Sequence, residues 1–235
     1  MTELRPHLSV DEPHGPVRAI ALVMHGGRAR SHSPVKARQL AVVRMLPFAR
    51  ALRRAGASDG LVVARLRYRM RGWNGAEQSP VADARWALDQ LTERFPGVPV
   101  ALVGHSMGAR TALYVADHPA VAVVVGLAPW IEQDDPVATL AGRRVLLAHG
   151  TRDRMTSAKG SAHYAAAAAS IAASMSYVSV QDEAHAMLRR AQVWHDLAAG
   201  YVVGALLGVT PKGTVDGNTT NVLTQALAGE ASLVV

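Results

Sequence analysis

The sequence contains no cysteine, which excludes disulfide bonds, thiolate metal sites and a cysteine nucleophile. Any nucleophile must therefore be an oxygen or an amine. Aromatic residues make up only 5% of the 235 residues and charged residues 18%, whereas 49% are hydrophobic. This composition is typical of a soluble globular chain and is too apolar for general disorder. We expect one domain over residues 1–209, followed by a C-terminal tail, 210–235, docked on that domain.

Long apolar runs are also absent. The opening stretch, MTELRPHLSVDEPHGP, has no apolar segment like that of a signal peptide. The longest late apolar stretch, LAAGYVVGALLGV, is too short to span a bilayer. We therefore expect a cytoplasmic protein that does not insert into membranes. The strong preference for arginine, with only three lysines, favours a bacterial source with a GC-rich genome.

The formal net charge is +7, which raises the possibility of a nucleic-acid partner. The arginines are spread along the chain, however, and few aromatic residues accompany them, so we expect no nucleic-acid binding. The densest cluster is RLRYRMR, whose alternation places Arg65, Arg67, Arg69 and Arg71 on one side of an extended segment. We interpret it as an exposed face with local ion pairs rather than as a phosphate track.

Apolar runs alternate with helical patterns along most of the chain. Buried strands are predicted at 19–24, 61–68, 98–104, 121–129, 143–150 and 174–180. Helices are predicted between them and after the last one, at 34–56 with a bend or restart at Pro47, at 79–95 with Ser79 as N-cap, and at 106–118, 157–174 and 184–208. This alternation predicts an α/β fold with a parallel sheet covered on both faces. No long insertion interrupts it, so we expect no cap domain.

The stretch LVGHSMGAR at 102–110 places a serine between two glycines, after an apolar run and before a helical pattern. Glycines two residues before and after Ser106 permit a sharp turn that holds the serine clear of the sheet. The backbone N–H of Met107 would face the same space and could stabilise an oxyanion. Taken alone, the pattern also fits a serine that only occupies a tight turn.

A serine nucleophile needs a base, and the base needs an acid to orient it. In a parallel sheet these residues should follow the carboxyl ends of strands. Asp153 in TRDRMT and His185 in QDEAHAML are placed in this way. The alternative acids are Glu132, Asp134 and Asp135 after the strand at 121–129, and the alternative bases are His163 and His195, which fall within helical patterns. The glycines of HGGRAR allow a second oxyanion donor, from Gly27 or Arg28.

Four motifs, HGG at 25–27, GHSMG at 104–108, HGTRD at 149–153 and DEAH at 182–185, occur in the order and at the strand ends typical of α/β hydrolases. Over Ala19 to Gly208 the chain resembles small lidless members of that superfamily, such as dienelactone-hydrolase-like proteins and small esterases. The resemblance implies that Ser106 is the nucleophile, His185 the base and Asp153 the acid. It also implies an oxyanion hole formed by Met107 with Gly27 or Arg28. The short N-terminal region favours a sheet of about six or seven strands rather than eight.

These residues predict a serine hydrolase that cleaves a small-molecule carboxylic ester or thioester through an acyl-enzyme. An acyltransferase with the same triad and a non-catalytic binding protein of the same fold are the alternatives. Trp130, Trp73 and Met187 are predicted to contact substrate. No histidine pair with a carboxylate has metal-ligand spacing, and no phosphate-binding lysine loop occurs, so neither a metal nor a cofactor is expected. The oligomeric state is left open.

Overall fold

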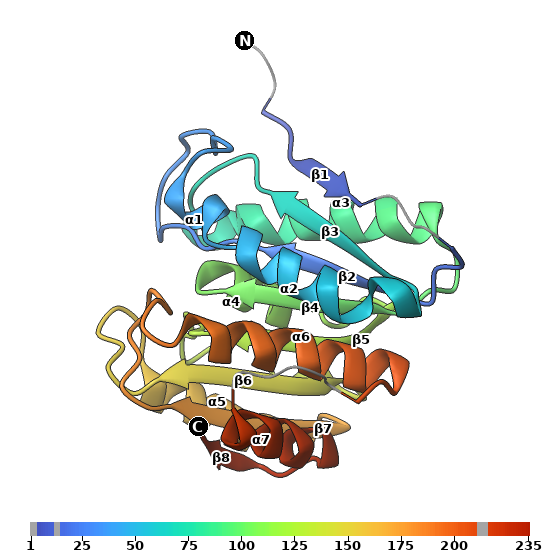
Figure 1. Ribbon diagram of the computed structural model, residues 1–235. Helices are drawn as coiled ribbons and strands as arrows, with labels where there is room; N and C mark the ends of the chain where they lie inside the picture. Colours follow the sequence, from blue (N-terminus) through green and yellow to red (C-terminus); the bar gives the residue numbers. More distant parts are fainter. Residues whose placement is uncertain (1–3, 12–14, 211–215) are drawn as a thin grey trace.

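The computed structural model describes residues 4–11, 15–210 and 216–235 and is built around one eight-stranded sheet. The strands are β1 His7–Val10, β2 Ala19–Met24, β3 Leu61–Arg67, β4 Val100–His105, β5 Val121–Leu127, β6 Arg144–Gly150, β7 Ser174–Val180 and β8 Ser232–Val234. Their order across the sheet is β1-β3-β2-β4-β5-β6-β7-β8. β1 runs antiparallel to β3, and all other neighbours are parallel. The predicted α/β class with a mostly parallel sheet is confirmed (Figure 1).

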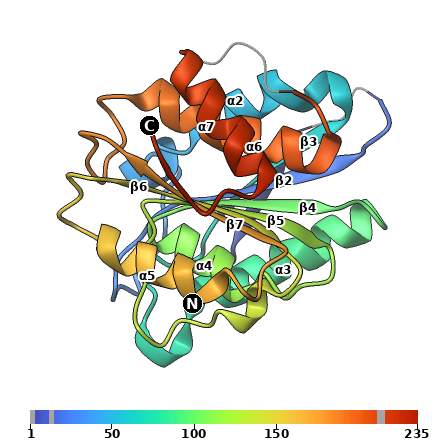
Figure 2. The same ribbon diagram turned by 90° about the horizontal axis from the view of Figure 1, so that it is seen from below.

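Helices cover both faces of the sheet (Figure 2). The α-helices are α1 Leu40–Val43, α2 Leu46–Gly56, α3 Ser79–Arg94, α4 Met107–Tyr114, α5 Ala158–Ala168, α6 Ala191–Leu207 and α7 Gly217–Ala228, with short 3-10 turns at Ala57–Asp59, Gly75–Glu77 and Ala138–Leu140. One hydrophobic core joins the sheet to α2, α6 and α7, and the second joins it to α3, α4 and α5. Among the described residues, no helix has the length and apolar character needed to cross a bilayer.

The central strand β2 is apolar at every position because both of its faces are buried. In β2, Ala19, Ala21 and Val23 belong to the core under α2 and α6, whereas Ile20, Leu22 and Met24 belong to the core over α3 and α4. All six residues are at most 1% exposed. A strand packed on two sides shows a continuous apolar run instead of the alternation of a half-exposed strand.

Two helix starts differ from the sequence prediction. The segment predicted to be helical from residue 34 is extended or turned up to Gln39, and α2 begins at Leu46 with Pro47 in its first turn. Proline suits that position because its missing N–H would have no helical partner there. Ser79 is the first residue of α3 rather than its N-cap, and its hydroxyl contacts Asn74 and Glu77.

The sheet has eight strands instead of six or seven because β1 and β8 extend its two edges. β1 is short and mostly half-buried, and its sequence, HLSV, does not stand out as an apolar run. β8 comes from the segment predicted as a docked tail. Within that segment, α7 packs against α6, and Leu233 of β8 is paired with Val178 of β7 and is 5% exposed. Residues 211–215 of the predicted tail lie outside the described part of the chain.

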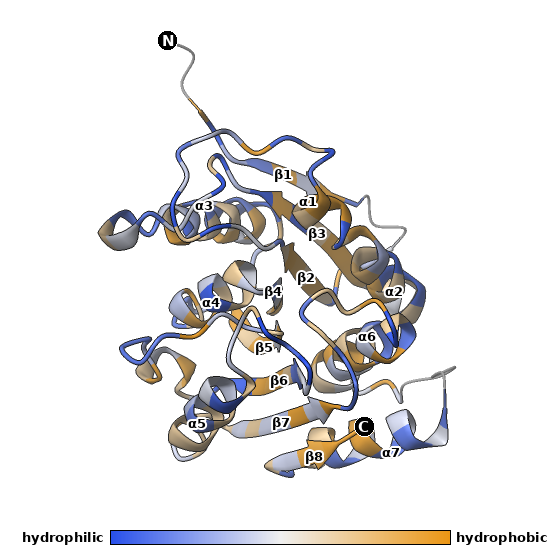
Figure 3. Ribbon diagram, turned by 90° about the vertical axis from the view of Figure 1, so that its left-hand side faces the viewer, coloured by the Kyte–Doolittle hydropathy of each residue, from blue (hydrophilic) through white to orange (hydrophobic). Residues whose placement is uncertain are grey.

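The direction of the chain across the sheet reverses between β2 and β4. From β2 the chain crosses to β3 on one side, and from β3 it returns to β4 on the other side of β2. The loops that leave the carboxyl ends of β2 and β4 therefore lead in opposite directions, and α/β sheets bind ligands at such a point. Figure 3 shows the edge of the sheet at which these loops lie.

A stability measurement tests the central position of β4. Leu102→Ala removes a side chain that is 0% exposed, and we expect it to lower the free energy of unfolding by about 2–5 kcal/mol. Leu188→Ala truncates the same side chain where it is 70% exposed and should change stability by less than about 0.5 kcal/mol. Urea denaturation of both variants measures the difference, and equal losses would contradict the assignment of Leu102 to the core.

Candidate active site

Ser106 lies at the sharp turn between β4 and α4. Its backbone has φ 55° and ψ −117°, a conformation that is strained for any residue with a side chain. The Ser106 N–H donates a hydrogen bond to the carbonyl of Leu127 at the end of β5, at 3.0 Å. Its carbonyl accepts hydrogen bonds from the backbone of Arg110 and Trp130. The turn has the geometry of a nucleophile elbow, which points a serine hydroxyl away from the sheet at a helix N-terminus.

The two glycines of the motif are required by backbone contacts across this turn. A Cβ on Gly104 would lie 2.3 Å from the carbonyl oxygen of Gly108, and a Cβ on Gly108 would lie 2.6 Å from the carbonyl oxygen of Met24. No side chain rearrangement relieves such clashes because both neighbouring atoms belong to the backbone. The spacing that the sequence shows around Ser106 therefore has a steric cause.

His185 and Asp153 meet at the carboxyl ends of β6 and β7. The Nδ1 atom of His185 lies 2.8 Å from Oδ2 of Asp153. The Asp153 side chain is 0% exposed, and that of His185 is 12% exposed. A buried carboxylate on Nδ1 orients the imidazole and leaves its Nε2 atom for proton transfer. The structure thus brings together the predicted base and the predicted acid.

Asp153 accepts hydrogen bonds on both of its oxygens. Oδ1 accepts the backbone N–H groups of Met155 and Thr156, while Oδ2 accepts the Thr156 hydroxyl at 2.8 Å and lies 3.1 Å from Nε2 of His149. Burial by itself would raise the pKa of this carboxyl group, but the hydrogen bonds from His149, His185 and the backbone outweigh burial and hold the pKa well below its usual range. Asp153 is therefore ionised wherever the protein is folded near neutral pH.

His149 and Thr156 were not predicted as parts of this cluster. His149 is 0% exposed, and its Nδ1 atom lies 2.9 Å from the hydroxyl of Ser161. The Thr156 hydroxyl also lies 3.1 Å from Nδ1 of His185. Both residues occur within HGTRDRMT, so their closeness to Asp153 in the sequence was the available signal. His149 lies in β6 and Thr156 in the loop that follows, and this loop brings Asp153 into contact with both side chains.

The loop that carries His185 is held by the buried residue Glu183. The Glu183 carboxylate is 0% exposed and accepts hydrogen bonds from the backbone of Arg190 and from Nε1 of Trp194 at the start of α6. Its carbonyl accepts the backbone N–H of Arg152. These contacts connect the His185 loop to the Asp153 loop on one side and to α6 on the other. His185 precedes α6 instead of lying in it, contrary to the predicted helix at 184–208.

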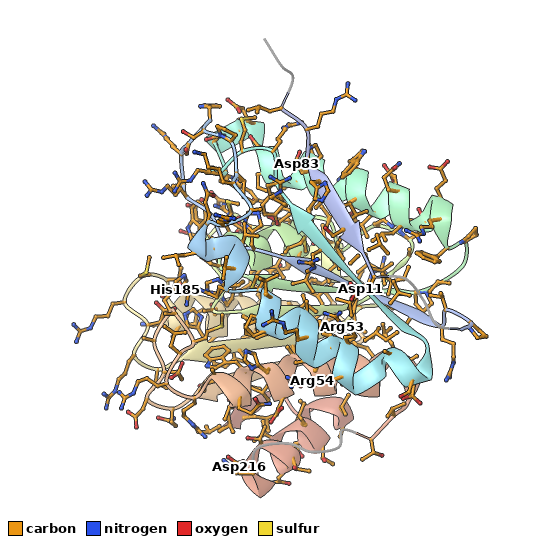
Figure 4. All side chains as sticks on the ribbon, turned by 45° about the horizontal axis from the view of Figure 1, so that its top comes forward. Asp11, Arg53, Arg54, Asp83, His185 and Asp216 are labelled. Atoms are coloured by element: carbon orange, nitrogen blue, oxygen red, sulfur yellow. The ribbon has the colours of Figure 1, made fainter. Side chains whose placement is uncertain are left out.

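His105, the residue before Ser106, contacts the same loop. Its Nε2 atom lies 3.0 Å from the carbonyl oxygen of His185, and the two imidazole centroids are 4.8 Å apart. Burial, with the charge of His185 adding to it, lowers the pKa of His105 to about 3. His105 is therefore neutral and carries its proton on Nε2, because a carbonyl can only accept. This contact places the predicted base beside the serine turn. Figure 4 shows His185 at this end of the sheet, far from the Asp11–Arg53 ion pair.

Of the two residues considered for the second oxyanion donor, Gly27 and Arg28, the backbone of Gly27 is better suited. Met107 is the first residue of α4, where helix N–H groups have no intrahelical partner. Gly26 packs against Ser106, and a Cβ on Gly27 would lie 2.3 Å from Cε of Met107. The Gly27 N–H makes no hydrogen bond within the described residues. Arg28 is unsuitable because its N–H already donates to the carbonyl of Arg71 at 2.8 Å.

The alternative acids and bases are engaged elsewhere. Asp135 is buried and accepts hydrogen bonds from Arg110 and from the hydroxyl of Tyr114. Glu132 also pairs with Arg110, at 2.7 Å, and Asp134 is exposed. His163 is exposed on α5, and His195 of α6 packs its ring against Phe48.

Two of the predicted substrate contacts, Trp73 and Met187, have buried side chains. Trp73 is 4% exposed and Met187 is 3% exposed. The guanidinium of Arg110 lies between two indole rings, with its carbon 4.2 Å from the centroid of Trp73 and 4.5 Å from that of Trp130. Met187 belongs to the core under α6. Half-buried Trp130 remains a candidate for substrate contact because its backbone binds Ser106 directly.

The rim around these residues is open and partly apolar. Met155 is 79% exposed, Leu188 is 70% exposed and Leu40 of α1 is 78% exposed. Arg44, which directly follows α1, donates a hydrogen bond to the carbonyl of Ala186 and so joins the end of α1 to the His185 loop. No cap domain covers the site in the described part of the chain. Within the same residues, no three histidine, aspartate or glutamate side chains are grouped so that they could hold a metal ion.

Comparison with known proteins extends the fold assignment. Residues 55–145 match a family model described as serine aminopeptidase, S33. No curated protein matches the chain. Among solved structures, a lidless α/β serine hydrolase from Xanthomonas campestris is 20% identical, with a TM-score of 0.62 over 88% of this chain and 91% of its own. The esterase Est1E from Butyrivibrio proteoclasticus is 11% identical, with a TM-score of 0.63 over 85% of this chain and 94% of its own.

A third structure, an α/β serine hydrolase homologue from Coxiella burnetii, is 16% identical with a TM-score of 0.59 over 83% of this chain and 90% of its own. At identities of 20% or less these likenesses concern the fold. The family model covers residues 55–145, and neither comparison determines the substrate.

The low pKa of Asp153 makes a prediction about stability. A carboxyl group whose pKa is lower in the folded state contributes stability above its unfolded pKa of about 3.9, and this contribution is lost as the pH falls below that value. Between pH 5 and pH 3 the wild type should therefore lose more stability than Asp153→Asn, which has no carboxyl group to protonate. Urea midpoints across this range measure the effect, and parallel curves for the two proteins would refute it.

Proposed function

We propose that this chain, which has the fold of α/β hydrolases, is a serine hydrolase that cleaves a small-molecule carboxylic ester or thioester through an acyl-enzyme on Ser106. The observation that supports this proposal most strongly is the convergence of a strained serine turn with a buried carboxylate–histidine pair. Ser106 has φ 55°, and Asp153 lies 2.8 Å from His185, whose loop contacts the residue before Ser106.

In the proposed reaction, the Ser106 hydroxyl attacks the carbonyl carbon of the substrate. His185 accepts the hydroxyl proton on Nε2, and the ionised Asp153 stabilises the imidazolium that forms. The carbonyl oxygen becomes an oxyanion that the backbone N–H groups of Met107 and Gly27 can stabilise. His185 then protonates the leaving alcohol or thiol, which departs and leaves the acyl group on Ser106.

Deacylation repeats these steps with water. His185 removes a proton from the water molecule, the resulting hydroxide attacks the acyl-enzyme, and the proton returns to Ser106 as the carboxylic acid is released. The open rim allows water to reach the site. If an alcohol or amine took the place of water, the same residues would perform acyl transfer, which is the alternative enzymatic function.

Covalent labelling tests whether Ser106 is activated. A fluorophosphonate probe should label the wild-type protein on Ser106, as mapped by mass spectrometry of the modified peptide, and Ser106→Ala should not be labelled. The variant should keep its fold because the small substitution retains the Cβ of the turn. A folded wild-type protein that resists the probe would favour the non-catalytic alternative over this proposal.

A matched pair of aspartates tests the assigned acid. Asp153→Asn should lower kcat for an activated ester by up to about 10⁴-fold, because an amide at this position stabilises neither the required tautomer nor the imidazolium. Asp182→Asn makes the same change two residues after the end of β7, where the carboxylate is 62% exposed and pairs with Arg152. It should leave kcat near the wild-type value. Full activity of Asp153→Asn in steady-state assays would place the acid elsewhere.

A further inference from the structure

A cavity of about 280 Å³ lies next to the proposed oxyanion donor. Its walls include Gly26 and Gly27 on one side and residues of the loop and helix that follow β2 on the other. A Cβ on Gly26 would lie 3.4 Å from the Cβ of Ser106, and a Cβ on Gly27 would lie 2.3 Å from Cε of Met107. A group bound in this cavity would therefore be adjacent to the serine that we propose as the nucleophile.

The charged residues that line the cavity are all basic. Arg28 and Arg71 both belong to the lining, and no aspartate or glutamate from the described chain does. Neither arginine takes part in an ion pair among the described residues. Arg28 is exposed and Arg71 is half-buried. Two cations beside one small cavity, without an internal carboxylate to neutralise them, favour an anionic occupant.

Arg67 adds positive charge behind the cavity wall. Its guanidinium donates a hydrogen bond to the carbonyl of Val35, a lining residue, at 3.1 Å. His25, also in the lining, has its pKa lowered to about 4, mainly by burial and to a smaller extent by the charge of Arg67. His25 is therefore neutral near pH 7, and the field in this region is set by the arginines.

The arginines of RLRYRMR have different surroundings in the structure. Arg69 forms an ion pair with Asp83, which is 1% exposed, at 3.4 Å. Arg67 is bound to the Val35 carbonyl, and Arg71 reaches the cavity. The nearby carboxylate of Glu77 is paired with His32 at 2.9 Å. The sequence interpretation of this run as a face with local ion pairs accounts for Arg69 but not for Arg71.

The remaining lining suits the carbon part of a substrate. The lining also includes Val35, which is 6% exposed, half-buried Ala41 and Leu40, which is 78% exposed. Pockets that combine apolar walls with a few charged groups bind amphipathic small molecules, and the charged groups provide the specificity.

We propose that this cavity binds a carboxylate carried by the substrate, so that the preferred substrates are esters or thioesters with an anionic group close to the scissile bond. Arg28 and Arg71 hold the carboxylate, and the apolar wall contacts the intervening carbon atoms. The inference rests on the proposed function and adds a substrate class to it.

Two pairs of esters, each differing only in charge, test the proposal. The first pair is 4-acetoxybenzoate and 4-acetoxybenzamide, in which the carboxylate or its neutral amide lies on the leaving group. The second pair is monomethyl terephthalate and methyl 4-carbamoylbenzoate, in which it lies on the acyl group. The measured quantity is the ratio of kcat/KM for the anionic ester to kcat/KM for its neutral partner. We expect the wild-type ratio to exceed one for at least one pair.

Arg71→Gln and Arg28→Gln should each lower this ratio roughly ten- to a hundredfold, the effect typical of one charge-assisted hydrogen bond. The matched control is Arg38→Gln. Arg38 lies in the same segment after β2 as Arg28 and is exposed, but it does not line the cavity. The variant should leave the ratio unchanged, which separates local binding from the general attraction of a basic protein for anions.

The outcomes distinguish this inference from the proposed function. If the wild type hydrolyses the neutral esters as well as or better than the anionic ones in both pairs, the cavity does not select carboxylates and only this inference fails. An equal fall of the ratio in Arg38→Gln would also overturn it. If none of the four esters is hydrolysed although the fluorophosphonate probe labels Ser106, only this inference fails. If the probe does not label Ser106 either, the proposed function fails, and this inference fails with it.

Discussion

Ser106 has a backbone conformation, φ 55° and ψ −117°, that costs free energy and is retained only because the surrounding structure leaves no alternative. The turn is confined between β5, whose Leu127 carbonyl binds the Ser106 N–H, and the end of β2, whose Met24 carbonyl lies against Gly108. Both strands are central and buried on two faces. The rigidity of the sheet therefore holds the serine in place, and the other site residues are arranged around this fixed point.

The second requirement of the site is that a buried carboxylate remain ionised. Asp153 is shielded from water, yet it accepts hydrogen bonds from two backbone N–H groups and the Thr156 hydroxyl and contacts two imidazoles. Without these donors, burial would favour the protonated acid. His149 has a supporting part here, because it is itself buried and bound to Ser161, so its ring offers Asp153 a hydrogen bond in a fixed direction. His185 is thus the more exposed of the two histidines on the same carboxylate.

Arginine serves three different purposes around the site. Arg110 stacks between Trp73 and Trp130 and binds Asp135, which stabilises the loop after β5 next to the Ser106 carbonyl. Arg44 connects α1 to the His185 loop. Arg28 and Arg71 lie at the cavity without an ion-pair partner among the described residues. Several arginines of this basic protein therefore have local roles around the site, and the net charge is not by itself evidence of a polyanionic partner.

The sequence by itself determined the α/β class, the order of the central strands along the chain and the positions of Ser106, Asp153 and His185 at strand ends, because buried strands and glycine turns depend mainly on local patterns. Tertiary structure alone decided the edge strands β1 and β8, which are short and have weak apolar patterns. It also decided that Trp73 and Met187 are buried, that the Arg28 N–H is occupied by Arg71, and that His149 shares the carboxylate of Asp153. Each of these outcomes depends on which side chains and backbone groups come into contact once the sheet has brought the loops together. A local residue pattern does not determine those contacts.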